Sequence, residues 1–117
     1  MHELGIVTYV ARQVDEVARE NEIDEIAEVV IEIGEVSGNV AEFLIDAWDY
    51  FRKTYPVLAG SKLRCETIKA ITHCDGCGRN YPTVQYGKTC PHCGSGETRL
   101  LVGRECNIKE ILVPDDE

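Results

Sequence analysis

The chain has 117 residues, of which 44% are hydrophobic and 28% are charged, so it has room for one modest core or a small core with an appended module. Its 21 acidic and 12 basic residues give a net charge of −9, which disfavours nucleic acid as a partner because phosphate recognition needs clustered basic side chains. No apolar run approaches the roughly 20 residues of a membrane span and no signal peptide is visible, so we expect a cytoplasmic protein without membrane association.

The first third of the chain predicts a helix followed by a strand. Residues 4–20 carry apolar side chains at helical spacing, and charged residues fill the opposite face. The predicted inner face consists of Leu4, Val7, Ala11, Val14 and Ala18. Residues 26–33 then alternate with a period of two, which favours a half-buried strand with Glu28 and Glu32 on its outer side.

A second helix and three further strands are predicted beyond residue 34. Asn39, with Glu42 three residues later, resembles a helix cap, and the helix should run to about residue 53 before Pro56 and Gly60. Alternating apolar residues predict strands at 62–71, 98–102 and 106–113. Between them, residues 73–96 are rich in glycine, cysteine and short polar pieces.

This order of elements predicts an α+β fold with two domains. We expect a small two-helix domain with a mixed β-sheet at 1–71 plus 104–117, and an inserted zinc-ribbon-like domain at 72–103. The last strand is expected to return to the first sheet, since it would otherwise lack a partner.

Four of the six cysteines form two C-x-x-C pairs, Cys74/Cys77 and Cys90/Cys93, separated by twelve residues. Two such turns facing each other provide four thiolates in a tetrahedron, which suits a closed structural Zn(II) site. A single iron, as in rubredoxins, fits the same ligands and would make the protein red. Because protein ligands fill all four positions, we expect no catalytic metal and no catalytic residues.

The remaining cysteines and the nearby histidines receive simpler interpretations. Cys65 and Cys106 fall in predicted strands and are expected to be small buried hydrophobic residues. His73 and His92 are interpreted as loop residues; the alternative is that either replaces a thiolate or tunes the metal site. The basic residues of this segment, Arg79, Lys88 and Arg99, are too few for a phosphate footprint.

The chain begins Met1-His2-Glu3, a tripeptide that can chelate a metal ion. The α-amine (pKa near about 8), the His2 amide nitrogen and the His2 imidazole can close fused rings around one ion. Nitrogen ligands in one plane suit Ni(II) or Cu(II). The alternative is that His2 is a solvated residue at a chain end, as most terminal histidines are.

Three features occur together: Met1-His2-Glu3-Leu4 leads into a helix, Ile33-Gly34-Glu35 ends a strand, and the C-x-x-C turns are paired. In this combination the chain resembles the HypA/HybF family of hydrogenase nickel-insertion metallochaperones. The resemblance implies nickel bound at Met1, His2 and Glu3, and a structural zinc at Cys74, Cys77, Cys90 and Cys93. It does not extend to the histidines that follow each cysteine pair in some members, because Gly78 and Gly94 stand there.

The resemblance further implies a carrier that delivers nickel for maturation of [NiFe]-hydrogenase. Its implied partners are the nickel-associated GTPase HypB and the precursor of the hydrogenase large subunit, and a homodimer is permitted. Two other functions remain open on the residues alone. They are a zinc-ribbon interaction module without nickel transfer, and a rubredoxin-like redox protein.

Overall fold

The computed structural model describes residues 3–115, and of Glu3 it describes only the backbone. The chain divides into two compact units, and each consists of separate stretches of sequence. The first unit comprises Met1–Glu32, Asn39–Glu66 and Asn107–Glu117, and the second comprises Ile33–Gly38 and Thr67–Cys106. The predicted insertion at 72–103 lies inside the second unit, which also takes in short neighbouring segments.

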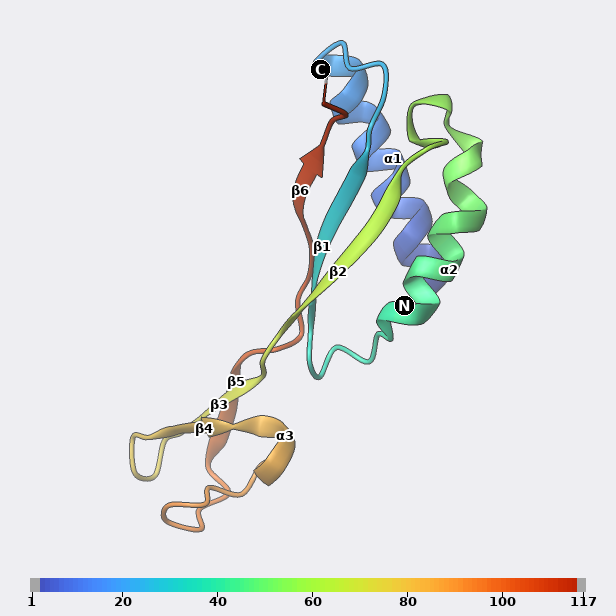
Figure 1. The fold of residues 1–117 in the computed structure, drawn as a ribbon. Helices are drawn as coiled ribbons and strands as arrows, with labels where there is room; N and C mark the ends of the chain where they lie inside the picture. Colours follow the sequence, from blue (N-terminus) through green and yellow to red (C-terminus); the bar gives the residue numbers. More distant parts are fainter. Residues whose placement is uncertain (1–2, 116–117) are drawn as a thin grey trace. The chain divides into compact units, whose positions relative to one another are not determined.

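The first unit contains two helices that pack against each other, α1 (Glu3–Glu20) and α2 (Ala41–Phe51) (Figure 1). The buried side of α1 consists of Ile6, Val7, Val10, Ala11, Val14 and Ala18. Leu4 was predicted on this side but is 54% exposed, so the burial of α1 begins only at Ile6. In α2, Leu44 and Trp48 are fully buried, as their spacing predicts.

A mixed three-stranded sheet has the order β2-β1-β6, from β1 (Glu28–Gly34), β2 (Lys62–Ile68) and β6 (Cys106–Leu112). In Figure 1, β1 and β2 run in the same direction and β6 runs in the opposite one. The last strand therefore returns to the first sheet, which confirms the prediction from topology. The central strand is buried more fully than a half-buried strand, since Val29, Val30 and Ile31 are all at most 1% exposed.

Two short 3-10 helices, Arg52–Thr54 and Pro56–Leu58, follow α2 and lead to β2. The predicted cap at Asn39 is wrong, because the helix begins at Ala41 and its N-cap is Val40. The Val40 carbonyl accepts hydrogen bonds from the backbone of Phe43 and Leu44, which defines the first turn.

The second unit contains an antiparallel sheet of order β4-β3-β5 and one short helix. The strands are β3 (Ile71–Cys74), β4 (Asn80–Pro82) and β5 (Thr98–Val102), and the helix is α3 (Thr83–Tyr86). The predicted strand at 62–71 is in fact two strands of different sheets. They separate at Ala70, whose N–H donates to the Glu35 carboxylate (2.9 Å) and whose carbonyl accepts from Thr83 N–H (3.1 Å).

Gly34 marks a close approach of two backbone segments within the second unit. A Cβ added at this position would lie 1.9 Å from the carbonyl oxygen of Gly103, so no larger residue fits without moving the chain. The segment is also fixed by Gly34 N–H donating to the Glu105 carbonyl (2.8 Å) and Val36 N–H donating to the Gly103 carbonyl (2.9 Å). The motif Ile33-Gly34-Glu35 therefore has a packing role in this unit.

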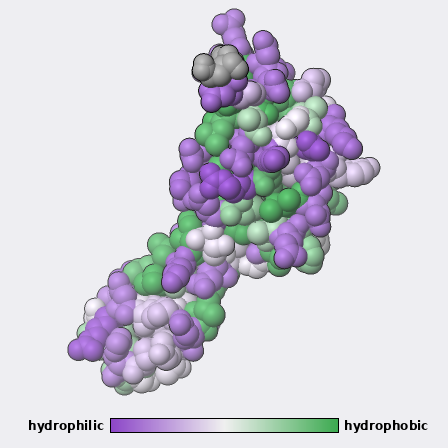
Figure 2. All heavy atoms as spheres, in the orientation of Figure 1, coloured by the Kyte–Doolittle hydropathy of each residue, from purple (hydrophilic) through white to green (hydrophobic). Residues whose placement is uncertain are grey.

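The surface carries both charged and apolar residues. On the face drawn in Figure 2, hydrophilic residues cover much of the surface and hydrophobic residues form smaller areas between them. Within residues 3–115, no helix is long and apolar enough to cross a membrane.

Candidate metal centre

The first cysteine turn follows β3. Cys74 is the last residue of that strand, and its carbonyl accepts a hydrogen bond from Gly78 N–H (2.8 Å). Cys74 N–H in turn donates to the carbonyl of Arg79 (2.8 Å). Gly78 adopts a φ of 77°, a left-handed conformation that glycine accepts without steric cost. The glycine after the pair therefore lets the chain turn back, so that the Arg79 carbonyl meets Cys74 N–H.

The second cysteine turn, between α3 and β5, repeats the same arrangement. Gly94 N–H donates to the carbonyl of Cys90 (2.9 Å), and Cys90 N–H donates to the carbonyl of Ser95 (3.0 Å). Gly94 has a φ of 75°. Two local turns of the same design thus present two pairs of sulfur atoms, as the sequence spacing predicts.

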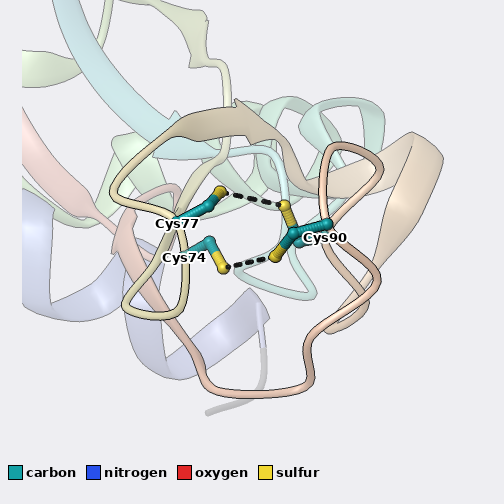
Figure 3. A group of neighbouring side chains, drawn as sticks. Cys74, Cys77 and Cys90 are labelled. Atoms are coloured by element: carbon teal, nitrogen blue, oxygen red, sulfur yellow. Dashed lines mark hydrogen bonds between the residues drawn. The ribbon is translucent and has the colours of Figure 1, made fainter.

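The two turns face each other and bring the four sulfur atoms together (Figure 3). All four Sγ atoms lie within 4.8 Å of one another, with Cys74 and Cys93 3.6 Å apart and Cys77 and Cys90 3.7 Å apart. Four sulfurs at about 2.3 Å from one zinc ion would be separated by about 3.8 Å in a regular tetrahedron. The cluster therefore fits a four-thiolate metal ion with little rearrangement.

The environment of the sulfurs differs from one cysteine to another. Burial opposes ionisation of Cys90, but hydrogen bonds from the backbone N–H groups of Cys93 and His92 and from the neighbouring thiols outweigh it and lower its pKa to about 7. A backbone hydrogen bond from Ser95 favours the thiolate of Cys93, but the adjacent cysteines and burial outweigh it and raise its pKa to about 12. A second thiolate beside the first is costly, so a divalent cation is the natural compensation for full deprotonation.

Neither histidine of this unit joins the sulfur cluster. Among the described residues, the only group of histidine, cysteine and acidic side chains close enough to hold a metal ion consists of the four cysteines. His73 lies in β3, where its Nδ1 is 2.6 Å from Asn80 Oδ1, and it is therefore not a loop residue. His92 is exposed, and its backbone N–H donates to Cys90 Sγ (3.3 Å). Sequence reasoning missed this backbone donor because every residue type except proline supplies an N–H group.

Cys65 and Cys106 do not contribute to the cluster. Cys65 in β2 is half-buried, whereas Cys106 in β6 is exposed, so the prediction of a buried Cys106 is wrong. Their strands are separated by β1, and the two residues are not neighbours in the sheet.

Of the three predicted nickel ligands, only Glu3 falls within the described residues. Met1 and His2 are outside the described residues, and Glu3 is the first residue of the helix. The first four N–H groups of an α-helix have no partner within the helix, so the backbone amides of this region are not needed for helical hydrogen bonding. Metal coordination by an amide nitrogen here would break no hydrogen bond of α1.

Comparisons with known proteins agree with this architecture. The family model described as "Hydrogenase/urease nickel incorporation, metallochaperone, hypA" matches residues 1–113. Hydrogenase maturation factor HypA of Chlorobium phaeobacteroides is 30% identical over 113 residues, covering 97% of this chain and 99% of that protein. The corresponding factor of Azoarcus sp. is 31% identical over 115 residues, covering 98% and 100%.

The fold is shared with a solved structure. The solution structure of the nickel metallochaperone HypA from Helicobacter pylori superimposes with a TM-score of 0.72 at 24% identity, over 97% of each chain. The match of the family model to nearly the whole sequence, together with relatives at 30% identity or more, decides the family. This chain belongs to the HypA family of metallochaperones for nickel incorporation in hydrogenase maturation.

Proposed function

We propose that this chain carries Ni(II) as cargo on Met1, His2 and Glu3 and releases it for maturation of [NiFe]-hydrogenase. The observation that carries the proposal is the family match, which begins at residue 1 and therefore includes the tripeptide. The α-amine, amide nitrogens and the His2 imidazole supply the planar nitrogen ligands that Ni(II) favours. Glu3 contributes an amide nitrogen or a supporting carboxylate.

The position of α1 supports this assignment. The helix begins at Glu3, so this proposed ligand belongs to its positive N-terminal end. That partial charge favours loss of a proton from a neighbouring amine or amide, which nickel binding requires. A chelate at the end of a chain also depends on few tertiary contacts, and a donor must release its metal readily.

The four cysteines would hold a resident Zn(II), which supplies folding energy to the second unit. All four positions of this ion would be filled by protein sulfur, so the centre has no open position for a substrate. That donor set disfavours catalysis at the zinc, and we infer a carrier rather than an enzyme. A colourless protein with one equivalent of zinc agrees with this assignment, whereas a red protein with the absorption of an iron–thiolate centre contradicts it.

Delivery requires other proteins. We infer that the chain works in the cytoplasm with the nickel-associated GTPase HypB and with the precursor of the hydrogenase large subunit. A homodimer is compatible with this role but not required by it. The family description also includes urease, so a urease precursor is a second candidate recipient of nickel.

The proposal is tested by nickel titration of the untagged, zinc-loaded protein and of the His2→Ala variant. His2→Ala should lose stoichiometric nickel binding in calorimetry while its zinc content and circular dichroism stay unchanged. His92→Ala is the matched control, because His92 is an exposed histidine outside the proposed nickel site and should leave nickel binding intact. Stoichiometric nickel in His2→Ala would overturn the assignment.

A second form of the test alters only the terminal amine. One extra residue before Met1 should abolish the nickel chelate, because the α-amine is then part of a peptide bond. Nickel affinity of the unmodified protein should also fall as pH is lowered, since binding must displace protons from nitrogen. An extended chain that binds nickel as tightly as the original would exclude the amine as a ligand.

A further inference from the structure

The second unit contains an open groove of about 650 Å³ whose lining residues all belong to that unit. Three of its lining side chains are cationic, Lys88, Arg99 and Arg104, and no aspartate or glutamate lines it. We propose that this groove binds an acidic peptide segment of a partner protein. The inference goes beyond nickel carriage and holds whether or not the N-terminal assignment is correct.

The charge of the groove is opposite to that of the rest of the chain. The protein has 21 acidic and 12 basic residues, yet a quarter of the basic residues line this one groove. Arg99 Nε lies 3.2 Å from Asp75 Oδ1, so part of its charge is already compensated. Within the described chain, Lys88 and Arg104 have no such carboxylate partner and remain available to a ligand.

Hydroxyl groups add directional donors beside the cations. Thr72, which is only 3% exposed, and Thr83 place their Oγ1 atoms 2.6 Å apart. One of these hydroxyls donates to the other, and the accepting hydroxyl keeps its own hydrogen for a further acceptor. A carboxylate entering the groove can therefore receive this hydrogen as well as the charge-assisted bonds of Lys88 and Arg104.

The size and composition of the groove favour a peptide over a small anion. Val36 and Leu100 also line it, so apolar and cationic side chains share the same opening. A free phosphate would use the cations but leave the apolar residues unoccupied. A peptide that carries both carboxylates and aliphatic side chains uses both kinds of surface.

The test uses the full-length, zinc-loaded protein and a fluorescein-labelled peptide of alternating glutamate and leucine. Anisotropy at low ionic strength should show saturable binding that weakens as salt is added, and a peptide with glutamine in place of glutamate should not bind. The double variant Lys88→Gln/Arg104→Gln should weaken binding tenfold or more, since two hydrogen bonds to charged groups are lost. Chemical-shift mapping of the unsubstituted protein should place the largest amide changes at Thr72, Lys88 and Arg104.

The matched control is Lys69→Gln/Arg79→Gln, which removes the same charge from exposed positions of the same unit outside this groove. It should retain nearly full peptide affinity. An equal loss in the control would mean general electrostatic attraction and would overturn the proposal. The proposal would also be overturned if the peptide did not bind or if the largest chemical-shift changes lay elsewhere. Displacement of the peptide by equimolar inorganic phosphate or by a DNA oligonucleotide would overturn it too.

Discussion

The two units of this molecule are stabilised by different kinds of interior. The first unit buries large apolar side chains of two helices and a sheet, among them Val14, Ile31, Leu44 and Trp48, each at most 1% exposed. In the second unit, the buried cluster consists of Cys74, Tyr81 and Cys90. Two of these three residues belong to the four-cysteine cluster, so the core and the candidate metal centre largely share the same residues.

This difference shows how the chain divides its stability. Burial of one large aliphatic side chain contributes about 1.5–3 kcal/mol, and the first unit has many such side chains. A small unit with few of them needs another source of folding energy, which a bound metal supplies. We therefore expect the two units to respond separately to metal removal and to core substitutions.

The largest effect is expected from removal of a zinc ligand. Cys77→Ser should unfold the second unit, because structural zinc binding in comparable peptides provides about 10–16 kcal/mol at neutral pH. The first unit should remain folded, and Trp48, the only tryptophan, reports on it directly through its fluorescence. Cys106→Ser is the matched control, because Cys106 is exposed and outside the cluster. Loss of the buried Trp48 emission in Cys77→Ser would show that the units are not independent.

An intermediate effect is expected from the core of the first unit. Trp48 is fully buried, and its Nε1 donates to Ser61 Oγ (3.0 Å), which donates to the Leu58 carbonyl (2.7 Å). Trp48→Ala should lower the free energy of unfolding of this unit by about 3–5 kcal/mol. Tyr50→Ala in the same helix removes a 75% exposed ring and should change it little. Denaturant titration followed by circular dichroism measures the free energy of unfolding of both variants. Unchanged zinc content in Trp48→Ala would show that the second unit keeps its metal when the first unit is destabilised.

The parts of the fold that the sequence predicted are those with local causes. The helical spacing of α1 and α2 and the glycines after each cysteine pair act within a few residues, and the structure confirms them. The alternation of residues 26–33 predicted a strand, which the structure has at β1, but not the burial of Val30. The cysteine cluster was predictable for the same reason. Each turn is defined by its own short sequence, and only the pairing of the two turns is long-range.

The features that the sequence did not predict depend on distant contacts or on very short elements. The end of β2 before Ala70 requires the Glu35 carboxylate, 35 residues earlier in the chain. The strand β4 and the helix α3 have three and four residues, too few to show a period. The cationic groove could not be predicted because Arg104 lies outside the cysteine segment of the sequence. Only the folded chain brings it to the same groove as Lys88 and Arg99. The nickel ligands Met1 and His2 stay a prediction.

The smallest effect is expected from the charged residues on the sheet of the first unit. A hydrogen bond from Lys109 Nζ (2.6 Å), with a further one from Arg64, lowers the pKa of Glu66 below its ordinary value of 4.5. Because the pKa of Glu66 is lowered in the folded state, the stability that its ionised carboxylate contributes is fully present above pH 4.5. This stability is lost as the pH falls through the pKa of the folded state. Because the Glu66 side chain is 34% exposed, solvent and salt screen the pair, so Glu66→Gln should only slightly reduce stability at neutral pH.

That difference between Glu66→Gln and the unsubstituted protein should narrow as the pH falls below 4.5 and also as salt is added at neutral pH. Glu25→Gln is the matched control, because Glu25 is exposed and belongs to no ion pair within the described part of the chain. Urea denaturation curves at several pH values, followed by Trp48 fluorescence, measure the effect in the first unit alone. A difference that persists unchanged at low pH would mean that Glu66 stabilises the unit through packing and not through its charge, because protonation removes only the charge.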